Sequence, residues 1–359
     1  MPPHSSRLSF LALLLIAAAA GCLNASTASH GTGFHPDGMN RVAAENLSFP
    51  LRMLWSYETD GNVYSTPAVH GDTIFFGSND GRVYALDRDG KRRWSYQTGL
   101  MVTSSPAVAD GVVYIGSWDK HLYALDAETG EEIWKVKIGE VAGSSPLVSE
   151  GTVYIGAGHG VYAIRDSEVL WAFETKGQVT SSPALFNGTI FIGSWDGALY
   201  AIDAGTGRLR WSYPAGGLIY SSPAVEDGTV YFGSEDGGVY AVRAGRLLWR
   251  YETNGEVYSS PAVEGGVVYI GSADGNIYAI RNGSPLWIFR TGGKVYSSPL
   301  VAGKAVIVGS NDGRIYALDK ERGSMIWSFQ TGDEVGSSPA VSGGRLYIGS
   351  RDKRVYAFG

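Results

Sequence analysis

Three sequence markers that recur in phase predict an all-β repeat fold made of eight copies of one unit. A tryptophan recurs every 37–40 residues, at positions 55, 94, 134, 171, 211, 249, 287 and 327. The proline of a Ser-Ser-Pro or Ser-Thr-Pro triplet recurs in the same rhythm, and so does a Tyr-Ala pair. A period near 40 residues is typical of solenoids and propellers, in which each repeat is one small supersecondary unit.

The composition excludes several classes of protein. Of the 359 residues, 44% are hydrophobic, which is enough for a large core and rules out disorder over most of the chain. The formal net charge of −6 argues against a basic surface for nucleic acid. A single cysteine excludes a disulfide framework and a thiolate metal cluster.

The N-terminus has the pattern of a secretory signal. A polar stretch with Arg7 precedes the apolar run Leu8–Ala20, which is too short to span a bilayer. The segment Ala19-Ala20-Gly21-Cys22 resembles a prokaryotic lipobox, in which the cysteine is alkylated with diacylglycerol and becomes the first residue. We therefore expect a signal peptide over 1–21 and lipidation of Cys22. Ordinary cleavage beside an incidental Cys22 and an uncleaved anchor are the alternatives.

Residues 22–50 are expected to form a tether between this anchor and the repeats. From Leu23 to Pro50 the chain is rich in Ser, Thr, Asn, Gly and His, and it shows no apolar periodicity. The signal and the tether together predict a lipid-anchored protein on the extracytoplasmic face of a cell-envelope membrane. The repeat domain is expected to span 51–359.

One copy, Glu256–Thr291, shows what each unit contains. Its strand-like segments are Val257–Val263, Val267–Gly271, Ile277–Ile280 and Leu286–Arg290, separated by Gly-Gly, Asp-Gly and Asn-Gly turns. Four short strands in about 40 residues make one propeller blade. The sequence therefore predicts an eight-bladed β-propeller of four-stranded blades.

The prolines and the chain ends predict how the ring is built. Proline cannot donate to a ladder, so the first strand of each copy should be an edge strand, which we place at the central channel. The adjacent serine pairs would then line that channel. The last copy stops after a third strand at Val355–Gly359, whereas Leu51–Tyr57 is a lone fourth strand. We expect Leu51–Tyr57 to complete the eighth blade and close the ring.

The repeats resemble the quinoprotein-type (PQQ-like) propeller family over residues 51–359. The family signature Asp-x-x-Thr-Gly-x-x-x-Trp stands at Asp126–Trp134 and Asp203–Trp211, with a near match at Asp319–Trp327. The resemblance implies that the repeated tryptophan docks each blade on its neighbour. It assigns this structural role to Trp55, Trp94, Trp134, Trp171, Trp211, Trp249, Trp287 and Trp327.

The resemblance raises the possibility of a quinone-dependent dehydrogenase, in which the cofactor carries the chemistry. Such enzymes have an adjacent cysteine pair, a calcium site and long insertions, and the sequence shows none of these. We therefore expect no catalytic residue, no metal and no cofactor. A ring of aspartates could bind metal, but tight hairpin turns explain these residues better: Asp80, Asp119, Asp196, Asp236, Asp274, Asp312 and Asp352.

Departures from the repeat mark a candidate contact surface on one rim. In propellers the turn between the second and third strands shares a face with the loop between blades. The residues expected there are Trp118, Trp195, His159, Tyr64, Tyr220, Tyr258 and Tyr296. Exposed aromatics would suit a protein or ligand contact. Alternatively, the tyrosines fill space between blades and the tryptophans lie flat on neighbouring turns.

These features favour a monomeric, lipid-anchored propeller that binds a protein in or near the cell envelope. It is similar to the lipoproteins of outer-membrane assembly, which have the same order of lipobox, tether and eight blades. A propeller that binds polysaccharide or a small ligand is one alternative. A PQQ-dependent dehydrogenase-like enzyme is the other.

Overall fold

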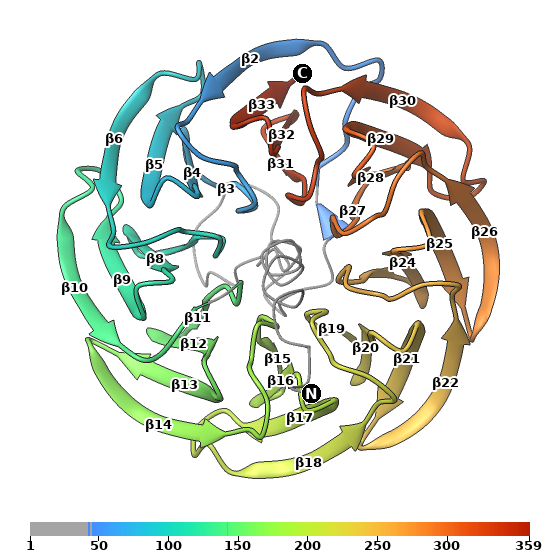
Figure 1. The fold of residues 1–359 in the computed structure, drawn as a ribbon, viewed down its shortest axis with the longest axis horizontal. Helices are drawn as coiled ribbons and strands as arrows, with labels where there is room; N and C mark the ends of the chain where they lie inside the picture. The colour runs from blue at the N-terminus through green and yellow to red at the C-terminus, as the bar shows by residue number, and fades with distance from the viewer. Residues whose placement is uncertain (1–41, 44, 142) are drawn as a thin grey trace, which may run out of the picture.

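The computed structural model describes residues 42–43, 45–141 and 143–359, and in these residues the chain forms 33 β-strands and no α-helix. The strands make eight antiparallel sheets that stand as blades around a central axis (Figure 1). The predicted eight-bladed propeller is therefore confirmed. No helix in the described part of the chain is long and apolar enough to span a bilayer.

Each of the first four blades runs from its inner strand to its outer strand in sequence order. Blade 1 contains β3 (Ala68–His70), β4 (Thr73–Gly77), β5 (Arg82–Asp87) and β6 (Arg92–Gln97). Blade 2 contains β7 (Ala107–Ala109), β8 (Val112–Gly116), β9 (His121–Asp126) and β10 (Glu132–Lys137). Blade 3 contains β11 (Leu147–Ser149), β12 (Thr152–Ala157), β13 (Gly160–Arg165) and β14 (Glu168–Glu174). Blade 4 contains β15 (Ala184–Phe186), β16 (Thr189–Gly193), β17 (Ala198–Asp203) and β18 (Leu209–Pro214).

The next three blades repeat this order. Blade 5 contains β19 (Ala224–Glu226), β20 (Thr229–Gly233), β21 (Gly238–Arg243) and β22 (Arg246–Glu252). Blade 6 contains β23 (Ala262–Glu264), β24 (Val267–Gly271), β25 (Asn276–Arg281) and β26 (Ser284–Arg290). Blade 7 contains β27 (Leu300–Ala302), β28 (Ala305–Gly309), β29 (Arg314–Asp319) and β30 (Met325–Gln330). The short β1 (Val42–Ala43) adds to its inner edge, parallel to β27.

Blade 8 joins the two ends of the chain, as the sequence predicts. It contains β31 (Ala340–Ser342), β32 (Arg345–Gly349) and β33 (Arg354–Phe358), with β2 (Met53–Glu58) as the outer strand. Antiparallel pairing places Ser56 opposite Tyr356 and Trp55 opposite Ala357. In Figure 1 the blue β2 arcs around the red β33. This pairing leaves no open seam in the ring.

The core lies between the blades. Second strands such as β4, β16 and β24 are buried at every position. They read as continuous apolar runs because blades cover both of their faces. Eight apolar clusters fill the spaces, each shared by two neighbouring blades.

The inner strands are shorter than the sequence suggests. In blade 6 the expected strand Val257–Val263 is reduced to β23, which begins directly after Pro261. The same holds in all eight blades, because each inner strand has three residues and starts after the repeated proline. A proline cannot donate to the ladder, so pairing starts only beyond it.

The serine pairs are buried and do not line a channel, so that expectation is wrong. The first hydroxyl of each pair accepts a hydrogen bond from the glycine at the end of the second strand, as in Gly271 N–H to Ser259 Oγ at 3.1 Å. In seven blades the second hydroxyl accepts one from the preceding blade, as in Ser222 N–H to Ser260 Oγ at 2.9 Å, whereas Thr66 Oγ1 of blade 1 has no partner within the described ranges. Side chains at these positions are at most 3% exposed. The pairs satisfy buried backbone donors within and between blades.

Five repeated tryptophans hydrogen-bond to the following blade. Trp94 Nε1 donates to the Ala127 carbonyl at 3.0 Å, and Trp171 Nε1 donates to Ala204 at 2.9 Å. The equivalent donors of Trp55, Trp287 and Trp327 reach Arg88, Lys320 and Leu51. The other three repeated tryptophans are Trp134, Trp211 and Trp249. The blade that each of them faces has only two residues in the turn between its third and fourth strands.

The signature turn of blade 2 shows why its residues recur. Asp126 Oδ1 accepts the Thr129 N–H at 2.8 Å and the Thr129 hydroxyl at 3.0 Å. Gly130 has a φ of 77°, and a Cβ there would lie 2.5 Å from the ring of Trp94. The glycine therefore allows both the left-handed turn and the close approach of the docking tryptophan.

The last part of the expected tether lies against the propeller. Residues 42, 43 and 45–50 are described, and the side chains of Leu47 and Phe49 pack on the apolar cluster between blades 7 and 8. A tether that is flexible as far as residue 50 does not agree with this packing. The signal peptide and Cys22 lie outside the described residues.

Candidate functional site

Six blades each place one aromatic side chain on the same face of the ring. These six residues form what we call the aromatic collar: Tyr64, Trp118, Trp195, Tyr220, Tyr258 and Tyr296. The tryptophans come from the turn between the second and third strands, and the tyrosines come from the segment that leads into the inner strand. We call this side of the propeller the collar face. The sequence placed these residues on one rim, and the contacts described next join four of them: Trp195, Tyr220, Tyr258 and Tyr296.

The collar tryptophans bind threonines of their own blades. Trp118 Nε1 donates to Thr103 Oγ1, and Trp195 Nε1 donates to Thr180 Oγ1, both at 2.8 Å. Each threonine occupies the position that holds tyrosine in other blades. Both indoles are half-buried, so each keeps an exposed surface on the collar face.

Three of the four tyrosines form a ladder with Trp195, and all four are almost fully buried. Ring centroids are 4.8 Å apart for Trp195 and Tyr220, 5.1 Å for Tyr220 and Tyr258, and 5.4 Å for Tyr258 and Tyr296. The four tyrosines retain only 4–8% exposure. Burial raises the pKa of Tyr220 above its usual value. This burial favours the interpretation that they fill space between blades.

Blades 3 and 8 interrupt the collar with glycine. Gly336 in blade 8 is covered by the ring of Tyr64, which would lie 3.4 Å from a Cβ there. Gly143 occupies the same position in blade 3, where the turn carries His159. His159 is exposed, and its carbonyl accepts the Thr175 N–H at 2.9 Å. Of the sequence-predicted rim residues, Trp118, Trp195 and His159 therefore offer accessible side chains.

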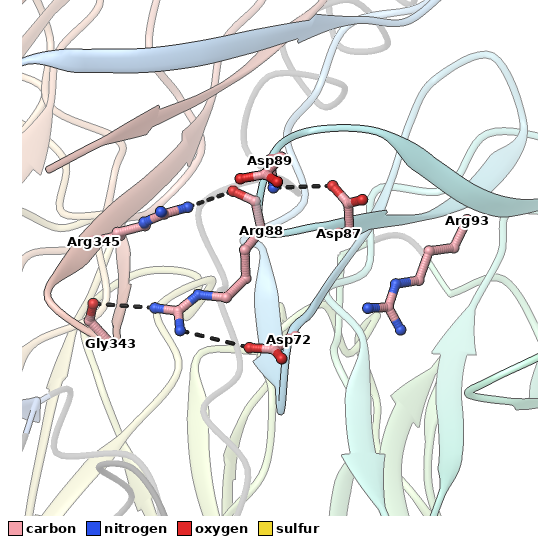
Figure 2. A pocket seen from close by; sticks show the side chains of 7 residues that line it. All are labelled: Asp72, Asp87, Arg88, Asp89, Arg93, Gly343 and Arg345. Carbon is pink, nitrogen blue, oxygen red and sulfur yellow. Dashed lines mark hydrogen bonds and ion pairs between the residues drawn. The ribbon is translucent and has the colours of Figure 1, made fainter.

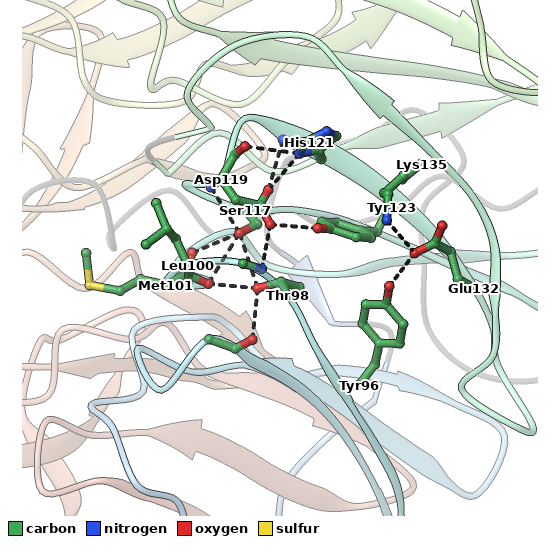
Figure 3. Close-up of polar contacts among 12 residues, drawn as sticks. Tyr96, Thr98, Leu100, Met101, Ser117, Asp119, His121, Tyr123, Glu132 and Lys135 are labelled. Carbon is green, nitrogen blue, oxygen red and sulfur yellow. Dashed lines mark hydrogen bonds and ion pairs between the residues drawn. The ribbon is translucent and has the colours of Figure 1, made fainter.

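The repeated aspartates act as hydrogen-bond acceptors that hold adjacent elements together. In blade 2, Asp119 Oδ2 accepts the Tyr123 hydroxyl at 2.6 Å and the Gly99 N–H at 2.7 Å (Figure 3). Its Oδ1 accepts the His121 N–H at 3.1 Å. Burial opposes ionisation, but the bond from Tyr123 and the two backbone bonds outweigh it and hold the pKa of Asp119 below its usual value.

The same geometry recurs in the other blades that have this aspartate. The tyrosine four positions later donates to the carboxylate at 2.8 Å in Tyr84–Asp80 and at 2.5 Å in Tyr278–Asp274. A backbone N–H twenty positions earlier donates to the same oxygen, for example Gly292 to Asp312 at 2.7 Å. Each carboxylate therefore ties its hairpin to the end of the preceding blade.

The described residues do not fit the calcium and quinone apparatus of the quinoprotein enzymes. No three His, Cys, Asp or Glu side chains converge within the described ranges. Each of the repeated aspartates already accepts at least three hydrogen bonds, as Asp119 and Asp352 do, and each lies in a different blade. The sequence has one cysteine, so an adjacent cysteine pair cannot form.

A polar cleft lies on the face opposite the collar, where blades 8 and 1 meet (Figure 2). It is open to solvent, has a volume of about 600 Å³ and is lined by Asp72, Asp87, Arg88, Asp89, Arg93, Gly343 and Arg345. Arg88 pairs with Asp72 at 3.5 Å and donates to the Gly343 carbonyl at 3.2 Å. Arg345 donates to the Arg88 carbonyl. The cleft offers charged groups of both signs, and sequence reasoning missed it because it joins distant turns.

The perimeter of the ring carries exposed aliphatic side chains, which sequence reasoning also missed. A β-bulge precedes the repeated tryptophan, so two successive side chains face solvent, as in Leu247 and Leu248. We call this group the aliphatic belt: Met53, Leu54, Ile133, Val169, Leu170, Leu209, Leu247, Leu248, Leu286, Ile288, Met325 and Ile326. Their exposed fractions are 41–55%. The signal was aliphatic residues at the two positions before tryptophan, which form a pair in four of the eight copies, together with Ile288 directly after Trp287.

Solved structures share this fold. BamB from Moraxella catarrhalis is 24% identical with a TM-score of 0.74, and the match covers 86% of this chain and 99% of that chain. A europium-containing methanol dehydrogenase is 15% identical with a TM-score of 0.78, covering 92% and 98%. A quinohemoprotein alcohol dehydrogenase from Comamonas testosteroni is 17% identical with a TM-score of 0.70, covering 86% and 76%. At these identities the likeness concerns the fold.

The comparison with protein families is more specific. A search of curated proteins found no match. The model of the family described as outer membrane protein assembly factor BamB matches residues 51–105, 100–166, 159–287 and 235–359. These matches extend over all eight blades and include the signature turns and docking tryptophans described above. The chain therefore belongs to the BamB family of PQQ-like propellers.

Proposed function

We propose that this chain is a non-enzymatic propeller that binds a protein of the cell envelope through the aliphatic belt. The belt carries the proposal. Twelve large aliphatic side chains stay 41–55% exposed around the perimeter, on the outer strands of seven blades. Leaving apolar surface in water costs about 25 cal/mol for each Å², so a partner that covers the belt would gain stability.

The outer strands also present free backbone groups beside these side chains. In each sheet the outer strand is the last in the hydrogen-bonding order, as β22 and β26 are in blades 5 and 6. An edge strand can accept an extended segment of another protein, which would lie across the exposed leucines. Leu248, Leu286 and Ile288 place such surfaces on neighbouring blades.

Membership of the BamB family supports a place in the cell envelope and a partner among assembly proteins there. We propose that a signal peptide over 1–21 is removed and that Cys22 is lipidated, so that the propeller of residues 51–359 is held as a monomer on the extracytoplasmic face. Mass spectrometry of the mature N-terminal peptide tests this step. A diacylglyceryl adduct on Cys22 supports it, and an unmodified Cys22 contradicts it.

Charge reversal on the belt tests the binding proposal. In detergent extracts of the native envelope, the full-length chain is expected to elute in size exclusion as part of a larger complex. The double substitution Leu248→Glu and Leu286→Glu should release it as a single propeller. Arg92→Glu is the matched control, because Arg92 is exposed two positions before the tryptophan of blade 1. A double variant that elutes with the native complex would contradict the proposal.

The polar cleft favours a second candidate, the binding of a small charged ligand or an acidic polysaccharide. Its three arginines and three aspartates could pair with a ligand that carries both charges or with spaced carboxylates. Isothermal titration with soluble oligouronate tests this function. Binding that Arg345→Ala abolishes would support it, and no heat with the native chain would contradict it.

The fold likeness to quinoprotein dehydrogenases makes an enzyme the remaining alternative, and one titration decides it. Pyrroloquinoline quinone is added to the chain with and without calcium while tryptophan fluorescence and dye-linked alcohol oxidation are followed. We expect no saturable change. Saturable, calcium-dependent binding of the quinone together with alcohol oxidation would show that the chain is an oxidoreductase and would contradict the scaffold proposal.

A further inference from the structure

The described chain begins on the axial side of blade 7. The two residues of β1 pair with β27, Val42 beside Val301 and Ala43 beside Ala302. Figure 1 shows β1 at the inner end of the blade, beside β27. Val42 packs on the cluster shared by blades 6 and 7. The inner edge of blade 7 is thus covered by the chain's own N-terminal segment.

The parallel pairing gives this segment a direction through the ring. The inner strand β27 starts after Tyr296, which belongs to the collar face, and ends at Ala302, before the turn at Gly303 on the opposite face. Because β1 runs parallel to β27, Val42 lies towards the collar face and Ala43 lies towards the opposite face. The two residues of β1 therefore run from the collar side of blade 7 towards the opposite face.

The residues that follow β1 continue along the opposite face. Glu45 Oε2 accepts the Gly344 N–H at 2.8 Å, in the turn between β31 and β32. The side chain of Asn46 covers Gly303, in the equivalent turn of blade 7. These contacts show that the chain lies on the opposite face before it turns outward.

The chain then reaches the perimeter and becomes the closing strand. The ring of Phe49 lies 6.3 Å from that of Trp327, and the Leu51 carbonyl accepts Trp327 Nε1 at 3.0 Å. Met53 begins β2 directly afterwards. The segment that closes the ring is therefore also the segment that passes through it.

We infer that the N-terminal segment threads the propeller along its axis and that, in the membrane-anchored protein, the collar face is turned towards the phospholipid bilayer. The orientation rests on the proposed lipidation of Cys22. The threading rests only on residues 42, 43 and 45–51. Twenty residues, 22–41, lie between the anchor and Val42.

The length of that connection favours the collar face. Since Val42 lies towards the collar face, the twenty residues that join it to Cys22 have a shorter distance to span when this face is turned towards the bilayer. The opposite face is farther along the axis by the depth of a blade, about 16–20 Å for strands of five or six residues.

The collar carries side chains that suit a membrane interface. Trp118 and Trp195 are half-buried there, whereas Tyr220 and Tyr258 are buried. Indole rings with one bonded N–H and an exposed apolar surface are enriched where protein meets lipid headgroups. The two tryptophans would face the headgroups in this orientation.

A disulfide tests the threading without any membrane. In a full chain carrying Cys22→Ser, the pair Ala43→Cys and Ala302→Cys should form a disulfide on mild oxidation, because these residues are register partners. The control pairs Ala43→Cys with Ala109→Cys, at the same position of β7 in blade 2. No bond in the first pair, or equal bonding in both, would overturn the threading.

A fluorophore on each face tests the orientation. Arg314 and Lys304 are exposed at opposite ends of blade 7, with Arg314 on the collar face. Bimane is attached to Arg314→Cys or Lys304→Cys in the lipidated full chain, and Cys22 is already blocked by its lipid. Phosphatidylcholine–phosphatidylglycerol vesicles carry a headgroup nitroxide. Quenching should be greater at position 314, and a 314-to-304 ratio at or below one would overturn the orientation.

The absence of the lipid anchor and a wrong orientation of the anchored chain give different results in these experiments. If Cys22 carries no lipid, the labelled chain stays in the supernatant when vesicles are sedimented, and the proposed anchor falls together with the orientation. The 43–302 disulfide would still form in that case. If the anchor is present but the orientation is wrong, the chain sediments and the label at position 304 is quenched more strongly.

Discussion

The backbone N–H of Ser222 donates to the hydroxyl oxygen of Ser260 at 2.9 Å, joining the inner ends of blades 5 and 6. Equivalent bonds join the other neighbouring pairs from blade 1 to blade 8, for example Ser105 N–H to Ser145 Oγ at 2.9 Å. The bonds form an arc inside the ring that does not depend on apolar packing. They explain why serine or threonine precedes the proline in every copy.

Removing one acceptor should weaken the whole ring. Ser260→Ala leaves the buried Ser222 N–H without its partner, which we expect to lower the free energy of unfolding by about 1–3 kcal/mol. Urea denaturation followed by circular dichroism measures the change. Ser284→Ala, at an exposed position of the same blade, is the control. Equal midpoints for the two variants would show that the bond contributes nothing.

The arc has a gap between blades 8 and 1, where threonine replaces serine. Thr66 Oγ1 is buried and has no hydrogen-bond partner within the described ranges. We expect Thr66→Ser to let the hydroxyl rotate towards the Ser338 N–H and to raise the free energy of unfolding by about 0.5–1.5 kcal/mol. Thermal melting checks this, and a lower melting temperature would contradict it.

The glycine that ends each second strand should not tolerate a side chain. A Cβ on Gly271 would lie 2.3 Å from Val295 Cγ1 in the next blade. Gly271→Ala should therefore cost about 1–3 kcal/mol in unfolding free energy. The double variant with Val295→Ala should lose less than the sum of the two single variants, because the shortened side chain relieves the clash. Strict additivity would contradict this packing.

Stability should fall steeply above pH 10. Burial, followed by the hydrogen bond to the aspartate, raises the pKa of Tyr123, Tyr278 and Tyr316 well above the usual value. A group with a raised folded-state pKa contributes its full stability below its unfolded pKa, near 10 for tyrosine, and loses it as pH rises towards the folded value.

An absorbance titration at 295 nm checks this pH dependence. Tyrosinate formation by these residues should coincide with loss of the β-sheet circular dichroism signal. Reversible ionisation of most tyrosines near pH 10, with the sheet signal intact, would show that the Tyr–Asp bonds are not formed in solution.

The number of blades and the closure of the ring can be predicted from the sequence far better than the functional surfaces can. Trp94, Gly130 and Asp126 recur because the docking of blades needs them, so periodicity alone gives blade number and closure. The serine pairs were misplaced because an edge position does not reveal which backbone donors are buried there. The threading of Val42 was missed because two residues carry no pattern.

The functional surfaces are harder to predict, because exposure depends on local geometry. Leu247 and Leu248 read as core residues of a strand, and only the bulge before Trp249 exposes both. Tyr220 reads as a rim residue, yet its contacts with Trp195 and Tyr258 bury it. Neither outcome follows from residue type or spacing.

A photocrosslinking scan around the perimeter tests the protein-binding account most directly. A benzophenone side chain is placed directly before each repeated tryptophan, in cells that assemble the native envelope: Leu54, Arg93, Ile133, Leu170, Arg210, Leu248, Leu286 and Ile326. We expect adducts with one protein at adjacent aliphatic positions and none at Arg93 or Arg210. The same side chain is placed at Trp118 and His159 on the collar face for comparison, and adducts at these two positions, with none on the belt, would contradict the account.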